Sequence, residues 1–237
     1  MARNVTLTRS IDLDLLNEVY EEYIAGLTKL ESKAKLDEII GQRISDKDNI
    51  RKTRTILQNL WFVEVDWFHE EASAAARYLN RIERLPIHWA MLMTYYPIFT
   101  DLCVVLGHMF EIKDAVSATQ IKEEIYSKWG ARTTLDASLS KTLKSLRDMD
   151  ALKRADKHTC YAKVAHNVSD YKVVALLFAA IMLATEQQYM TWEGFITHPA
   201  IFPFTINSVT QADMAAIPYL AMERMGENVV FRIKENI

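Results

Sequence analysis

The chain has 237 residues, half of them hydrophobic, and only 6 glycines and 5 prolines, which excludes a disordered or collagen-like protein and favours a compact, helix-rich fold. A net charge of −3 argues against a protein that coats nucleic acid non-specifically. Two distant cysteines, Cys103 and Cys160, form no disulfide framework or thiolate metal cluster, and the N-terminal residues lack the apolar core of a signal peptide. The expected location is therefore the cytoplasm.

The first 112 residues are predicted to form an all-α helical bundle. Amphipathic patterns predict helices over 11–27 (with Ser10 as its cap), 31–41, from near 45 to 61, and 66–83. A long apolar helix over 87–110, bent at Pro97, should follow. The apolar stretches Trp89–Phe110 and Val173–Ala184 are expected to be core helices rather than membrane spans. The first carries Pro97 and Asp101 near its middle, and the second has only 12 residues.

Residues 113–168 are predicted to form a winged helix, a helix-turn-helix followed by a β-hairpin. Ser117 and Gln120 have the spacing of a capping box, and Gly130 is a helix stop. Thr133 or Thr134 can cap the next helix, which leaves a connection of about four residues, the length of a helix-turn-helix turn. Residues 151–154 and 159–164 then flank a turn and indicate the two strands of a wing.

The second helix of this motif separates into two faces at 100° per residue. The apolar face holds Leu135, Leu139, Thr142, Leu143, Leu146 and Met149. The opposite face is short and hydroxyl-rich, with lysines near its middle: Thr134, Ala137, Lys141, Lys144 and Asp148. Ser140 and Arg147 lie at one margin, and Ser138 and Ser145 lie at the other.

Positive charge collects in the same segment. Residues 117–163 carry ten Lys/Arg and six Asp/Glu, whereas acids exceed bases on both sides of it. The predicted DNA contacts there are Arg132, Thr133, Thr134, Lys141, Lys144, Arg147, Lys153, Arg154 and Lys157. A second basic cluster places Arg51 and Arg54 on one helix face with Lys47, where they could touch phosphates. The alternative is that these residues pair with Asp46, Asp48 or acids of a neighbouring helix.

Residues 169–237 are predicted to form a C-terminal α+β lobe, unless the whole chain is one compact unit. A helix is expected over 170–187, and Phe204–Ile206 is a candidate extended segment. Ser208 and Gln211 repeat the capping-box spacing and predict a helix across 209–225, interrupted near Pro218. Residues 229–234 alternate like a strand. This order is compatible with a second, degenerate winged helix.

No catalytic pattern occurs in the sequence. The six histidines never pair at i,i+4, and there is no nucleophile elbow, phosphate-binding glycine loop or dinucleotide fingerprint. The acids Glu64, Asp66, Glu70 and Glu71 are dense, but such runs are far commoner on solvated helices than at metal sites. We therefore expect no catalytic residues, metal, cofactor or small-molecule substrate.

The order of several short motifs resembles the BrxA family, small accessory proteins of BREX phage-defence systems. The motifs are Ile24–Leu27, Arg54–Trp61, Leu85–Trp89, Tyr96–Asp101, Ile121–Gly130, Leu143–Leu152 and Gly226–Ile233. The resemblance covers most of the chain, although each motif is short. It implies a cytoplasmic helical protein with a winged helix that binds duplex DNA beside larger defence proteins, and it supplies no catalytic residues.

The sequence thus predicts a mostly α, non-enzymatic DNA-binding protein with weak sequence specificity. Lysines and serines rarely specify bases, and only Arg147 could read a guanine. One alternative is a protein adaptor that docks through the winged helix. Another is an RNA-binding module that uses the N-terminal helices with Arg51 and Arg54. An enzyme is the third.

Overall fold

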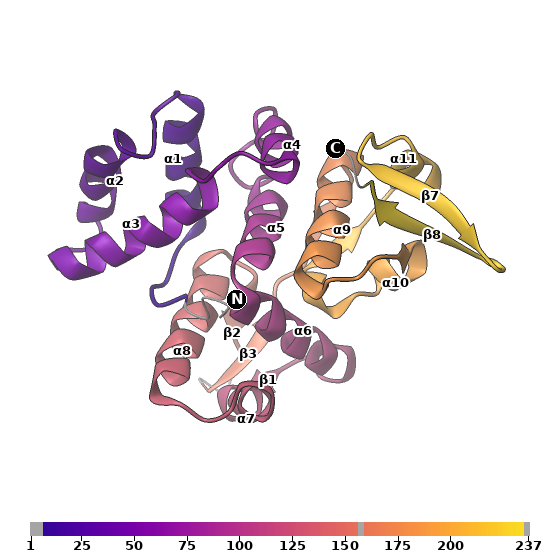
Figure 1. Ribbon diagram of the computed structural model, residues 1–237. Coiled ribbons are helices and arrows are strands. Elements are labelled where there is room, and N and C mark those ends of the chain that lie inside the picture. The colour runs from indigo at the N-terminus through magenta and orange to yellow at the C-terminus, as the bar shows by residue number, and fades with distance from the viewer. Residues whose placement is uncertain (1–6, 156–158, 235–237) are drawn as a thin grey trace.

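The computed structural model describes residues 7–155 and 159–234, and Figure 1 shows their arrangement. These residues are mostly helical, as the sequence predicts, with three small sheets. Helices occupy the described residues up to Ile112, and the strands of the described ranges all follow residue 115.

Four amphipathic helices open the fold: α1 (Leu13–Ile24), α2 (Ser32–Gly41), α3 (Lys47–Trp61) and α4 (Trp67–Ala76). Their starts follow from aspartate caps. Asp12, Asp46 and Asp66 each accept a hydrogen bond from the backbone N–H three residues further on. Asp12, not the predicted Ser10, therefore caps α1. The fourth helix ends at Ala76 and not near residue 83, and turns lead from it to α5.

The long apolar helix expected over 87–110 is two helices, α5 (Leu85–Tyr95) and α6 (Pro97–Ile112). Pro97 begins α6 and has no N–H to continue α5, so the chain turns by 116° at this break, far more than a bend within one helix. No single helix in the described ranges has the length and apolar composition to cross a bilayer, whereas α5 and α6 taken together reach that threshold despite their bend.

The middle segment contains two helices and a three-stranded antiparallel sheet. Along the chain come β1 (Val116–Ser117), α7 (Ala118–Trp129), α8 (Thr133–Asp148), β2 (Leu152–Arg154) and β3 (Cys160–Lys163). The sheet order is β1-β3-β2, with Val116 opposite Tyr161 and Leu152 opposite Lys163. The predicted hairpin is thus present, and β1 is an additional strand.

The C-terminal part begins with β4 (His166–Val168) and α9 (Tyr171–Thr185), which Asp170 caps. It continues through β5 (Met190–Thr191), α10 (Trp192–Ile196), the 3₁₀ helix η1 (Pro199–Ile201), β6 (Phe204–Ile206) and α11 (Gln211–Ala215). It closes with β7 (Leu220–Met225) and β8 (Asn228–Ile233). The candidate extended segment 204–206 and the strand within 229–234 are both present.

The helix predicted over 209–225 is wrong in two respects. It starts with a capping box of Thr210 and Asp213 in place of Ser208 and Gln211, and α11 has only five residues. Residues 220–225 form β7, which pairs antiparallel with β8 along its whole length. Cross-strand pairing therefore overrides the local preference of this segment for a helix.

The two three-stranded sheets share one topology. In the second, β5 and β7 flank β8, so both sheets have the order first-third-second. In both, the first strand has two residues and leads straight into a helix that its own last residue caps, Ser117 for α7 and Thr191 for α10. A buried residue of that strand lies opposite an aromatic one in both cases, Val116 opposite Tyr161 and Met190 opposite Phe231.

The connection between α10 and α11 packs back on the rest of the chain. Its strand β6 pairs with β4 in parallel, and η1 packs against α6. At that contact the backbone of Pro199 faces Gly107, and the Trp89 indole donates to the Ala200 carbonyl at 3.0 Å. One hydrophobic core therefore runs through all three regions, as the close packing of α5 and α9 also shows (Figure 1).

Candidate nucleic-acid interface

Local signals mark both ends of α7, and the turn from α7 to α8 is short. Ser117 and Gln120 form the predicted capping box, and Gly130 ends α7 with a φ of +74°, a conformation that favours glycine. The residue at the N-cap position of α8 is Arg132, whose side chain makes no capping bond, so neither Thr133 nor Thr134 is the cap. Thr133 is instead the first helical residue, and the connection is one residue shorter than predicted.

An acid on α8 fixes its position relative to α7. The Asp136 carboxylate accepts a hydrogen bond from the Tyr126 hydroxyl and lies 2.8 Å from the Lys122 ammonium. The hydrogen bond from Lys122, followed by that from Tyr126, lowers the pKa of Asp136. Asp136 therefore stays ionised at neutral pH and joins the two helices of the motif.

The two predicted faces of α8 are confirmed by burial. Leu135, Leu139, Thr142, Leu143, Leu146 and Met149 are all buried. Thr134, Ala137, Lys141, Lys144 and Asp148 are all exposed. The helix therefore presents a polar strip to solvent and turns its apolar side toward the core.

One margin of α8 has a role that the sequence did not reveal. Ser138 and Ser145 are buried beneath the N-terminal segment, where Ser145 Oγ accepts from the backbone N–H of Ile11 at 2.9 Å. Ser138 Oγ donates to the carbonyl of Leu7 at 3.3 Å. These two serines therefore attach the start of the chain to α8, and they are unavailable to a ligand.

The exposed lysines of α8 differ in their partners. Lys144 forms an ion pair with Asp148 one turn away. No side-chain ion pair or hydrogen bond occurs for Lys141 among the described residues. A phosphate would therefore compete with Asp148 for Lys144, whereas Lys141 is free to meet it.

Other predicted contacts lie at the ends and edges of the same face. Arg132 and Thr133 are exposed at the start of α8, and Arg147 is half-buried near its end. On the hairpin, Lys153 and Arg154 are exposed on β2, and the Arg154 guanidinium lies 4.7 Å from the centre of the Tyr161 ring. Lys163 on β3, absent from the predicted set, is also exposed. Lys157 lies outside the described residues.

The second predicted cluster lies on α3, and its side chains form ion pairs of the kind that the alternative interpretation expects. Arg54 is 9% exposed and forms an ion pair with Asp37 of α2, so it is removed as a DNA-contact candidate. Arg51 is exposed but lies 2.7 Å from Asp48, which also holds Lys52 at 2.5 Å. Arg51 thus pairs with an acid of its own helix, and Arg54 pairs with an acid of the neighbouring helix α2.

Two buried histidines elsewhere in the fold each have a structural partner. His69 is buried and its Nε2 lies 3.1 Å from the Trp61 carbonyl, and His88 is buried with its Nε2 3.3 Å from Asn17 Oδ1. Burial lowers the pKa of His88 to about 3, so this ring is neutral. Within the described residues, no three His, Cys, Asp or Glu side chains are grouped so as to hold a metal.

The comparisons with known proteins supply no relative. No protein-family model, curated protein or solved structure matches this chain.

Proposed function

We propose that this chain is a non-enzymatic accessory protein that binds duplex DNA through a winged helix formed by α6, β1, α7, α8, β2 and β3. The order of these elements and the sheet order β1-β3-β2 support this proposal, since both are typical of winged helices. In such folds the second helix of the helix-turn-helix commonly lies in the major groove. That helix here is α8.

The observation that carries the proposal is the polar face of α8. This face sets Lys141, which has no ion-pair partner among the residues that the structure describes, among exposed small and hydroxyl side chains. It lies beside a hairpin that bears Lys153 and Lys163. Short side chains let a helix approach the phosphates closely, and lysines neutralise them without reading bases. The DNA contact should therefore be salt-sensitive and weak in sequence preference.

The C-terminal lobe is proposed to be a second, degenerate winged helix that does not contact DNA. Its topology repeats that of the first unit, but α11, the counterpart of α8, has five residues against sixteen. Residues 190–234 carry three Lys/Arg and four Asp/Glu, so they lack the positive charge of the first unit. The segment between α10 and α11 packs against α6 and β4.

The biological setting is proposed from the motif order noted in the sequence. The resemblance to the BrxA family supports a role in bacterial phage defence, together with other proteins of the BREX system. In that setting the cytoplasm is the proposed compartment. The second candidate function is a protein adaptor, because winged helices also dock other proteins. The ion pair between Lys144 and Asp148 favours this role, since it lowers the free positive charge of α8.

The test is fluorescence anisotropy of the full chain on a labelled random-sequence duplex between about 50 and 200 mM salt. Lys141→Glu should weaken binding, and it should reduce the slope of log K against log salt by about 0.9 for the lost phosphate contact. Lys33→Glu on α2 makes the same charge change at an exposed site on another helix and is the matched control.

Three results discriminate between the candidates. Loss of affinity in Lys141→Glu, with the control unchanged, supports DNA binding through α8. Equal losses in both variants mean a non-specific charge effect and contradict the assigned surface. No binding by the wild-type chain excludes the simple DNA proposal and favours the adaptor.

A further inference from the structure

A cavity of about 740 Å³ lies away from α8, where three parts of the chain meet. Its walls come from residues 78–86, which connect α4 to α5 and form the start of α5, from the strand β4 with its flanking residues, and from the first turn of α9. Leu79, Leu85, Pro86, Val168 and Val173 provide apolar walls. This volume is within the range of small-molecule sites.

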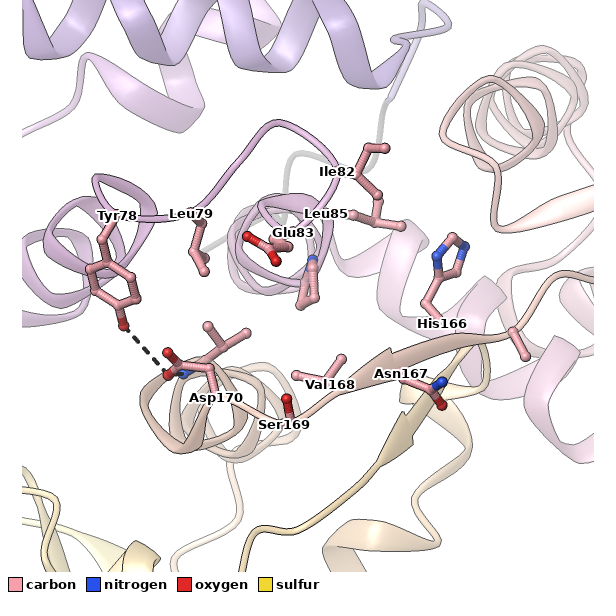
Figure 2. A pocket seen from close by; sticks show the side chains of 13 residues that line it. Tyr78, Leu79, Ile82, Glu83, Leu85, His166, Asn167, Val168, Ser169 and Asp170 are labelled. Atoms are coloured by element: carbon pink, nitrogen blue, oxygen red, sulfur yellow. Dashed lines mark hydrogen bonds between the residues drawn. The ribbon is translucent and has the colours of Figure 1, made fainter.

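Two carboxylates lie on different walls of this cavity. Figure 2 shows Glu83 on the segment before α5 and Asp170 at the start of α9. Neither forms an ion pair with a described lysine or arginine, and no residue lining the cavity is a lysine or arginine. The cavity therefore carries two negative charges without a cation of its own.

The remaining polar groups add further acceptors. The Tyr78 hydroxyl donates to Asp170 Oδ1 at 3.4 Å (Figure 2), which leaves the phenol oxygen and Asp170 Oδ2 able to accept. His166 Nε2 lies 2.9 Å from the carbonyl of Asp150 and must donate to it, because a carbonyl only accepts. In the neutral ring Nδ1 is then an acceptor.

The Tyr78 hydroxyl keeps its proton and can therefore remain the donor to Asp170. Burial, and after it the negative charge of Asp170, raises the pKa of Tyr78 to about 12, so the phenol remains protonated at neutral pH. Tyr78 is still 53% exposed, and Ile82, which also lines the cavity, is 70% exposed. The cavity is therefore open to solvent beside the Tyr78 and Ile82 side chains, and a ligand that enters it can reach the carboxylates.

We propose that this cavity binds an organic cation, an alkylguanidinium or alkylammonium group, between Glu83 and Asp170. Its N–H groups would donate to the two carboxylates, and its alkyl part would pack on Leu79, Pro86 and Val173. The cation could be a free amine or guanidine, or the side chain of a lysine or arginine in a partner protein. The chemistry that recognises it is the same for both sources.

The experiment is calorimetric titration of the full chain with N-butylguanidinium chloride, with N-butylurea as a neutral probe of nearly the same shape. The cation should bind and the urea should not. Glu83→Gln removes one charge with little change of shape and should weaken cation binding about tenfold. Asp170 caps α9, so it is left unchanged. Glu227→Gln, in the exposed β7–β8 turn, is the matched control and should bind as wild type.

A second titration distinguishes the two sources. The probe is the capped tripeptide acetyl-Leu-Arg-Leu-amide, which carries the same guanidinium between apolar side chains. Tighter binding of the peptide assigns the site to a partner protein, and tighter binding of N-butylguanidinium assigns it to a free ligand. The proposal is overturned if neither cation binds, if the urea binds equally well, or if Glu83→Gln and Glu227→Gln behave alike.

Discussion

Replacing Gly107 by alanine should destabilise the fold through a single added methyl group. A Cβ at this position of α6 would lie 2.1 Å from the carbonyl oxygen of Pro199 and 2.6 Å from its carbonyl carbon and Cα. Ordinary contacts begin at 3.4 Å, so η1 must move by more than an ångström. Because these atoms are backbone, no side-chain rotation can relieve the overlap.

The size of the effect follows from two opposing terms. Overpacking of a core costs about 1–3 kcal/mol, and here the obstacle is rigid, which favours the upper end. Alanine is better than glycine in a helix by roughly 1 kcal/mol. The net loss should therefore be about 2 kcal/mol, which corresponds to roughly 4–8 °C in Tm for a chain of this length.

Urea unfolding followed by circular dichroism measures this loss, and Gly41→Ala is the matched control. Gly41 is the last residue of α2, and an added Cβ there meets only Ile50 Cδ1 at 3.9 Å. The same chemical change should therefore leave stability unchanged or raise it by a few tenths of a kcal/mol. The packing argument is refuted if Gly107→Ala is as stable as wild type, or if the two variants shift the midpoint alike.

Three further predictions concern buried and paired side chains. The pKa of His88 is about 3 in the folded chain and 6.5 ordinarily, so between these pH values the unfolded chain binds more protons than the folded chain. The free energy of unfolding should therefore fall as the pH drops below 6.5, by up to about 1.4 kcal/mol per pH unit. His88→Gln should flatten this pH profile, which urea unfolding measures. Ser145→Ala leaves the N–H of Ile11 buried without its acceptor and should cost about 1–3 kcal/mol by the same assay, whereas a cost near zero would mean that water replaces the hydroxyl. Arg54→Gln breaks the ion pair with Asp37 and should lower stability, while the DNA affinity measured by anisotropy should stay within about twofold of wild type. A larger loss of affinity would mean that Arg54 does contact DNA.

The sequence predicted most about the segment where periodicity and local chemistry agree. The apolar positions of α8 recur at helical spacing, and a capping box and a glycine bound α7, so both helices and the buried face of α8 could be read from the chain. The partners of its polar residues could not. Nothing local in the sequence places Ile11 against Ser145, or Asp37 against Arg54, because those contacts depend on how distant elements pack.

The strands were harder to predict for two different reasons. Strand β1 has two residues, too few to show an alternating pattern, and it exists because β3 pairs with it. Strand β7 reads Leu-Ala-Met-Glu-Arg-Met, a run of good helix formers, yet it pairs with β8. Both depend on a partner strand further along the chain, so tertiary pairing decides their conformation.

The cavity of Glu83 and Asp170 is also a product of packing. Its walls come from two segments, 78–86 and 165–173, that are far apart in the sequence, and neither acid belongs to a motif. Within the described part of the chain, neither carboxylate forms an ion pair with a lysine or arginine, which is visible only once the surroundings of each carboxylate are known.

The connection between α10 and α11 has a consequence for how the protein can be divided. A fragment ending before α9 would lose the carbonyl that accepts from the Trp89 indole, the backbone that covers Gly107 and the strand beside β4. Such a fragment exposes apolar surface and a bare sheet edge, both of which promote aggregation. Unfolding should accordingly be a single cooperative transition, and limited proteolysis should not release a stable fragment that contains α6, α7 and α8 without the C-terminal part.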